Sequence, residues 1–131
     1  MKAFKGSAGI CLQDKKLLMV LQGTADEEKL WSVPSGGLAA GETFEACCIR
    51  EIYEETGYHA AIQSFVKTKE TTVKDFEVTI NYYLVEITGG DRTFHNPDQL
   101  IHDIAWIDYD RLMNLSLSFE EDRELLLSYL K

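Results

Sequence analysis

The stretch Gly36–Tyr58, GGLAAGETFEACCIREIYEETGY, is the most informative part of this chain because it joins a glycine-rich loop to an acidic helix. Thr43 is a good N-cap and Gly57 suits the left-handed conformation that ends helices, so we predict a helix over residues 43–56. One side of this helix is apolar and is expected to face the core: Ala46, Ile49, Ile52 and Tyr53.

Three glutamates fall on the opposite side of the helix at spacing i, i+3, i+4: Glu51, Glu54 and Glu55. At roughly 100° per residue they span an arc of about 100°. Several glutamates in a row usually form a solvated helix face, and such a face normally mixes both signs of charge. Here Arg50 is the only basic residue between Leu30 and Val66, whereas the same stretch holds five acids.

The position of these glutamates also argues for a bound cation. Glu54 and Glu55 lie in the last helical turn, where the helix dipole disfavours a negative charge by roughly 0.3–1 kcal/mol. The glycine-rich loop at residues 34–37 precedes the helix and can approach a ligand with its backbone. Mg²⁺ prefers oxygen ligands and is usually bound by a few carboxylates together with substrate phosphates. We therefore infer a metal-assisted phosphate site.

The same stretch resembles a known family motif, the Nudix box, written Gly-x5-Glu-x7-Arg-Glu-U-x-Glu-Glu-x-Gly-U, where U is apolar. Every fixed position is filled between residues 36 and 58, including Glu42 and the run from 50 to 57. Tyr58 is the loosest fit, since the last U is usually aliphatic. The preceding segment, residues 31–34, is also similar to the family's approach to the box. The fixed spacings make the motif specific.

The resemblance implies an α+β fold, namely an α/β/α sandwich around a mixed β-sheet. It also implies hydrolysis, dependent on Mg²⁺ or Mn²⁺, of the diphosphate link in a nucleoside diphosphate joined to another moiety. The substrate would be a nucleoside triphosphate, oxidised or not, or a compound similar to ADP-ribose. Metal ions on the phosphate oxygens would offset negative charge and lower the pKa of a coordinated water.

The resemblance further implies roles for single residues. Metal ligands would come from three side chains and a backbone carbonyl of the preceding loop: Glu51, Glu54, Glu55, and Ser35 or Gly36. Glu51, Glu54 and Arg50 would be the catalytic residues, with one glutamate helping to deprotonate the attacking water. Which glutamate is the base stays open, because bound metals perturb all of them. Arg50 would orient a carboxylate, with Glu42 as its charge partner.

The composition indicates one domain spanning residues 1–131, because 45% hydrophobic residues are enough for a core. The net charge of −9 argues against a stable nucleic-acid partner, which would need clustered positive charge. The three cysteines show neither a disulfide nor a zinc pattern. No secretory signal is recognised, and the apolar run 17–21 is too short to span a membrane. We expect a cytoplasmic monomer or homodimer whose partner is a small nucleotide diphosphate.

The rest of the chain is mostly β-prone. Strands are expected over residues 3–12, 17–22, 31–33, 59–72, 76–87 and 101–107. The segment 34–37 is expected to interrupt the β structure. A closing helix is expected over residues 120–130, with a buried stripe formed by Leu125, Leu126 and Tyr129.

Trp31 and Lys67 are the candidate substrate contacts outside the box. Lys67 shares a strand face with Lys69 and could meet a phosphate, although a solvated face is the more common arrangement. Tyr82, Tyr83 or Trp106 could stack on a base, and core packing is the default for Trp106. At most one of the two tyrosines points into a given site, because alternate strand residues face opposite ways. A further metal ligand could come from Glu77, Asp98 or Asp103.

Two alternatives to a small-nucleotide hydrolase stay open. A non-catalytic nucleotide-binding regulator on the same fold would be expected to lose a catalytic carboxylate, and this chain keeps all three. An RNA 5′-end pyrophosphohydrolase would share the chemistry but needs a basic track for the RNA chain. Three positions depart from residues common in the family and leave the substrate open: Gln22, Ser35 and Ala39.

Overall fold

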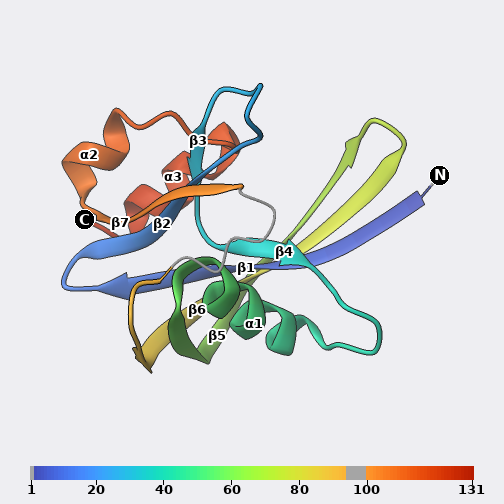
Figure 1. Ribbon diagram of the computed structural model, residues 1–131, viewed down its shortest axis with the longest axis horizontal. Helices are drawn as coiled ribbons and strands as arrows, with labels where there is room; N and C mark the ends of the chain where they lie inside the picture. The colour runs from blue at the N-terminus through green and yellow to red at the C-terminus, as the bar shows by residue number, and fades with distance from the viewer. Residues whose placement is uncertain (1, 94–99) are drawn as a thin grey trace.

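The computed structural model describes residues 2–93 and 100–131. Within these ranges the strands are β1 Lys2–Gln13, β2 Lys16–Gln22, β3 Leu30–Ser32, β4 Ser35–Gly37, β5 Tyr58–Val73, β6 Phe76–Gly90 and β7 Ile101–Ile107. The helices are α1 Phe44–Thr56, α2 Tyr109–Met113, a 3-10 turn η1 Glu120–Asp122, and α3 Arg123–Ser128. Figure 1 shows α1 on one side of the strands and the C-terminal helices on the other.

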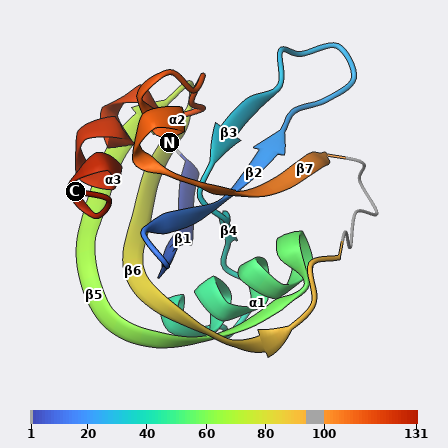
Figure 2. The same ribbon diagram turned by 90° about the vertical axis from the view of Figure 1, so that its left-hand side faces the viewer.

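The strands form a mixed sheet in the order β3-β2-β1-β6-β5, with β4 also paired to β1 and β7 to β2. β1 runs parallel to β6, whereas the other pairs are antiparallel. The β5–β6 pair contains three register shifts, and β-bulges of this kind bend and twist a sheet. Figure 2 shows the result, a strongly curved β5–β6 ribbon that encloses the central strands.

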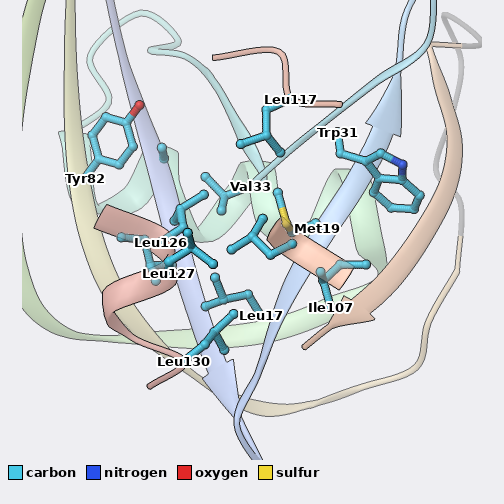
Figure 3. Close-up of a cluster of buried hydrophobic side chains, with 13 residues drawn as sticks. Leu17, Met19, Trp31, Val33, Tyr82, Ile107, Leu117, Leu126, Leu127 and Leu130 are labelled. Carbon is cyan, nitrogen blue, oxygen red and sulfur yellow. The ribbon is translucent and has the colours of Figure 1, made fainter. Parts of the chain in front are cut away.

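The two sides of β1 build two cores. Gly9 faces α1 closely: a Cβ added there would lie 2.6 Å from Ile52 Cδ1, so only glycine allows this approach. Ile52 joins one core with Cys11 and Cys48. Ala8, on the opposite side of β1, joins the second core beneath the C-terminal helices (Figure 3), with Leu17, Met19, Trp31, Tyr82, Leu126 and Leu127. The α+β sandwich around a mixed sheet is therefore confirmed.

The α1 helix begins and ends where the sequence predicts. The Thr43 hydroxyl accepts a hydrogen bond from the backbone N–H of Ala46 at 3.1 Å, and Gly57 has φ of 82°. The predicted core face was only partly right. Ile52 is buried, but Ala46 is exposed and Tyr53 is 38% exposed, with its ring stacked on His59. The helix is rotated because its small residues pack on the sheet: the buried positions are Cys47, Cys48, Ile52 and Thr56.

Two other elements differ from the predictions. Residues 34–37 do not simply interrupt the β structure, because Ser35–Gly37 forms β4 against β1. Gly6 permits this pairing, since a side chain there would collide with the Gly36 carbonyl. The closing helix is split into η1 and α3, and its buried apolar positions are Leu126, Leu127 and Leu130, with Leu125 and Tyr129 only half-buried.

The remaining strands lie close to their predicted bounds, and α2 was not predicted. Asp108 caps α2, because its carboxylate accepts from the backbone N–H of Arg111 at 2.9 Å. Across residues 2–93 and 100–131, no helix combines the length and the apolar character needed to cross a membrane.

Candidate active site

The acidic end of α1 lies directly against β4. Gly36 has no side chain, and the carboxyl group of Glu51 occupies the place where a Cβ would lie. The backbone N–H of Ser35 donates to Glu55 Oε1 at 3.3 Å. Backbone groups alternate in direction along a strand, so Ser35 and Gly37 turn theirs away from β1, toward the helix. The glycine strand and two helix glutamates thus share one site.

Arg50 ties the acidic groups together. Its guanidinium donates to both carboxylate oxygens of Glu42, at 2.7 and 2.8 Å, which is the charge pair expected from the sequence. Its Nη1 donates to Glu51 at 2.8 Å and to Glu54 at 3.1 Å. The same guanidinium reaches the Gly37 carbonyl at 2.9 Å. A planar guanidinium suits such multiple contacts, and a lysine could not make them all.

The carboxyl groups of the site have pKa values shifted in opposite directions. Hydrogen bonding from Arg50 lowers the pKa of Glu42 to about 2. In contrast, burial raises the pKa of Glu51 to about 7, and the neighbouring Glu54 adds to this rise. Burial also raises the pKa of Glu55 well above its usual value, and the charge of Glu51 raises it further. The positive charge of Arg50 is therefore too little for these carboxylates, and a second positive charge would stabilise their ionised forms.

The residues present fit a hard divalent cation as an open site rather than a closed cage. In the described part of the chain, no three His, Cys, Asp or Glu side chains converge in a metal-holding arrangement. Glu51 and Glu54 share Arg50, and Glu55 bonds the β4 backbone. Carboxylate and carbonyl oxygens are nonetheless the donors that Mg²⁺ prefers, and Mg²⁺ usually completes its shell with waters and phosphates.

The carbonyl of Gly36 differs from that of Ser35. Gly36 pairs with Ser7 of β1, and its carbonyl also lies 3.4 Å from Cys47 Sγ as a hydrogen-bond acceptor. Ser35 is turned toward Glu55. Of the two backbone positions considered as metal ligands, Ser35 therefore has the more suitable orientation.

A pocket of about 440 Å³ adjoins this site on the other side of β4. Ser35 and Gly36 belong to both, because they line the pocket while contacting the α1 glutamates. Most of the lining is apolar and comes from β1, β5 and β6, and Phe119 and η1 complete it. Four rings contribute: Phe4, Phe76, Tyr82 and Phe119. Aromatic and aliphatic walls of this kind suit the faces of a planar ring.

The candidate substrate contacts lie in different places. Trp31 is 8% exposed and sits in the core shown in Figure 3, with the Arg111 guanidinium 5.2 Å from its ring centroid. It does not line the pocket, so the structure lends no support to Trp31 as a substrate contact, which stays a prediction. Lys67 lies outside the pocket lining, with Nζ 5.3 Å from the ring centroid of Tyr82, whereas Lys69 lines the pocket.

Only one of the two adjacent tyrosines faces the pocket, as predicted. Tyr82 lines it, whereas the Tyr83 hydroxyl donates to Glu45 of α1 at 3.3 Å, on the opposite face of the sheet. Trp106 packs edge-on against Tyr58 at 6.0 Å between ring centroids, which agrees with its default core role. Period-2 alternation on β5 and β6 could have identified further pocket residues: Thr71, Val73, Val78 and Ile80.

The other candidates have ordinary partners or lie outside the described residues. Asp103 accepts a hydrogen bond from Arg92 at 2.9 Å, and Gln22 donates to Ser32 Oγ at 2.7 Å. Glu77 is exposed on β6 and faces away from the pocket, because its neighbours Phe76 and Val78 line it. Asp98 lies outside the described residues. Phe119 and Asp122 were missed, since no local sequence pattern marks them.

These features define a class: an α+β domain with an oxygen-rich helix end beside a glycine strand and an apolar pocket. The NUDIX domain model matches residues 3–129, nearly the whole chain, and the protein belongs to that family. A NUDIX hydrolase from Nitrosomonas europaea shares the fold, with a TM-score of 0.85, 20% identity and coverage of 98% of this chain and 88% of that one.

Two curated relatives illustrate the range of the family. One is named 8-oxo-(d)GTP phosphatase, from Mycolicibacterium smegmatis, and is 30% identical over 101 residues, which cover 77% of this chain. This chain spans only 30% of the length of that relative. The other is named RNA pyrophosphohydrolase, from Erythrobacter litoralis, and is 24% identical, with coverage of 91% of this chain and 85% of the relative.

Proposed function

We propose that this chain is a Mg²⁺-dependent Nudix hydrolase that cleaves the diphosphate link of a nucleoside diphosphate derivative. The observation that carries this proposal is the contact of Glu51 and Glu55 with a glycine strand that also lines an apolar pocket, with Glu54 joined to Glu51 through Arg50. The family membership and the name of the 8-oxo-(d)GTP phosphatase relative point the same way. A nucleoside triphosphate is the substrate class that we favour.

The metal would be held by Glu51, Glu54 and Glu55, with a β4 carbonyl at Ser35 or Gly36, and Mn²⁺ could replace Mg²⁺. When bound, it would supply charge neutralisation at the phosphate oxygens and a more acidic water. Arg50 holds Glu51 and Glu54 in place through hydrogen bonds of 2.8 and 3.1 Å. One of these two glutamates would accept the proton of the attacking water.

The substrate would lie across β4. Its phosphates would approach the α1 glutamates, and its base would enter the pocket between Phe4 and Phe119. The pocket walls would offer apolar contact to the base, and the β4 backbone would contact the linking phosphates. This placement explains why a short strand without bulky side chains separates the two regions.

Turnover of a panel of nucleotides with and without Mg²⁺ tests the proposal. Glu54→Gln and Glu55→Gln are expected to reduce kcat by about 100-fold or more, because each removes a charged oxygen from the site. Glu45→Gln on the first turn of the same helix is the matched control and should retain activity. No metal-dependent turnover on any nucleotide, or full activity in both site variants, would refute the proposal.

The RNA-end alternative is favoured by one observation, the RNA pyrophosphohydrolase relative that matches 91% of this chain. The pocket argues against a long RNA, because it is apolar and the chain carries a net charge of −9. Comparing free GTP with a 5′-triphosphorylated RNA in one assay separates the two. Tight nucleotide binding without any turnover would instead favour the regulator.

A further inference from the structure

Two buried polar contacts at the start of α1 take no part in the proposed chemistry. Ser7 of β1 and Cys47 of α1 are both 0% exposed. The Ser7 hydroxyl donates to the backbone carbonyl of Phe44, the first residue of α1, at 2.6 Å. The Cys47 thiol donates to the Gly36 carbonyl at 3.4 Å. Because Ser7 and Gly36 lie opposite each other in the β1–β4 register, both contacts join one residue pair of the sheet to the first turn of the helix.

Cys47 begins a row of α1 residues that lies along β4. Cys47, Glu51 and Glu55 are spaced i, i+4, i+8, so they share one face of the helix. The Cys47 thiol contacts the Gly36 carbonyl, and the Glu51 carboxyl occupies the side-chain position of Gly36. Glu55 accepts a hydrogen bond from the backbone N–H of Ser35. Cys47 is thus the uncharged member of a row whose other two members are carboxyl groups.

The adjacent Cys48 is a thiol in a different setting. It is 1% exposed, so it is as buried as Cys47. Its sulfur lies over β1, where a Cβ added to Gly9 would be 3.2 Å away, and it belongs to the apolar core that includes Ile52. The two neighbouring thiols therefore differ in what they contact: Cys47 meets the backbone of β4, whereas Cys48 packs in the core.

The position of Cys47 suits an anchor for the charged residues around it. Glu51 and Glu55 form a pair at i, i+4, and like charges at this spacing repel each other. The thiol adds no charge to this row, and burial raises its pKa, so it remains a hydrogen-bond donor. Nη2 of Arg50 lies 4.0 Å from Cys47 Sγ, while Nη1 of the same guanidinium donates to Glu51. One sulfur atom therefore contacts both β4 and the arginine that holds Glu51.

We propose that Cys47 is a positioning residue whose thiol, together with the Ser7–Phe44 hydrogen bond, fixes where α1 lies along β4. By doing so it sets the positions of Glu51 and Arg50. This inference rests on the proposed function for the roles of those two residues. Groups that hold metal or catalytic ligands in place typically contribute about 10–100-fold to metal affinity or activity. A thiol is a weak donor, so we expect an effect of about tenfold.

Steady-state kinetics of three variants test this role. Cys47→Ala removes the donor and should lower kcat about tenfold with KM changed less than about twofold, since the pocket lies on the other side of β4. Cys47→Ser keeps a donor and should recover most of that loss. Cys48→Ala deletes the same sulfur atom from the core and is the matched control. It should lower the melting temperature as Cys47→Ala does, but keep kcat.

Two further measurements need no turnover. A hydrogen-bonded thiol absorbs infrared light at a lower S–H stretching frequency than a thiol without such a bond. The difference spectrum of wild type minus Cys47→Ser should therefore show a band at lower frequency than that of wild type minus Cys48→Ser. Calorimetric titration with Mg²⁺ alone should give a dissociation constant about tenfold higher for Cys47→Ala than for Cys48→Ala.

The outcomes separate positioning from simple packing. Equal loss of kcat in Cys47→Ala and Cys48→Ala, or no recovery in Cys47→Ser, would show that the thiol only fills space and would overturn the inference. Equal S–H frequencies for the two thiols would also overturn it, even if Cys47→Ala does not fold. If wild type hydrolyses no nucleotide while the infrared and Mg²⁺ differences hold, only the proposed function fails. Wild-type kcat in Cys47→Ala would refute only this inference.

Discussion

The carboxylate site and the apolar pocket lie on either side of β4 and are built in different ways. The carboxylate site comes almost entirely from one continuous stretch, residues 35–57, in which helical spacing and a glycine strand bring the charged groups together. The pocket draws on β1, β4, β5, β6 and the C-terminal segment, which meet only when the sheet curves.

This difference shows which parts of a binding site can vary independently. The charges on α1 depend on local geometry: a change in Arg50 disturbs several of them at once, and a side chain at Gly36 would displace Glu51. Apart from Ser35 and Gly36, the pocket residues are scattered along the chain, so single changes there alter the pocket without moving the glutamates. The two regions are thus separable, with β4 as their common boundary.

The largest effect is expected from Gly36→Ala, which breaks the contact between the two regions. The added methyl group would occupy the place of the Glu51 carboxyl, so that side chain must move. We expect kcat to fall by about 100-fold, since displacements near 1 Å have such effects. Steady-state kinetics measure this, and Gly89→Ala, which has open space around it, is the control. Unchanged activity in Gly36→Ala would show that Glu51 is not held as described.

A smaller effect is expected in the pocket. Phe119→Ala removes a ring from its lining and should raise KM roughly tenfold with little change in kcat, because the proposed base–aromatic stacking is lost. Trp31→Phe changes the core instead and should lower the free energy of unfolding by about 1–2 kcal/mol while leaving KM unchanged. Kinetics and chemical denaturation measure both. The reverse pattern would support Trp31 as a substrate contact.

The smallest effect concerns stability and pH. Burial raises the pKa of Glu51 to about 7, so the folded protein keeps a proton there that the unfolded chain releases near its ordinary value of 4.5. Without divalent cations, the melting temperature should therefore fall by a few degrees between pH 5 and pH 7.5. The low pKa of Glu42, about 2, acts below this window.

Mg²⁺ should reverse that trend, because it binds the ionised carboxylates. Adding it should raise the melting temperature more at pH 7.5 than at pH 5, as measured by calorimetry. Glu55→Gln should reduce the Mg²⁺ response, whereas Glu45→Gln should keep it. A melting temperature that rises between pH 5 and pH 7.5 without cations, or that ignores Mg²⁺ at both pH values, would contradict the electrostatics described here.

Much of the carboxylate site was predictable because its geometry is local. Thr43 and Gly57 set the ends of α1, and spacing along a helix brought Glu51, Glu54 and Glu55 to one side. The rotation of α1 was not predictable in the same way. Tyr53 looked like a core residue by periodicity, yet small side chains at Cys47 and Cys48 let the helix pack closely on β1, which turned Tyr53 outward.

The sequence by itself determined the family, the acidic helix and the Arg50–Glu42 pair, because each depends on residues within a few helical turns. Only the tertiary structure decided that Trp31 is a core residue and that Phe119 and Asp122 reach the pocket. These positions are far apart along the chain, and their meeting depends on how β5 and β6 bend around β1. No local pattern encodes that curvature, since it arises from bulges and packing across the whole sheet.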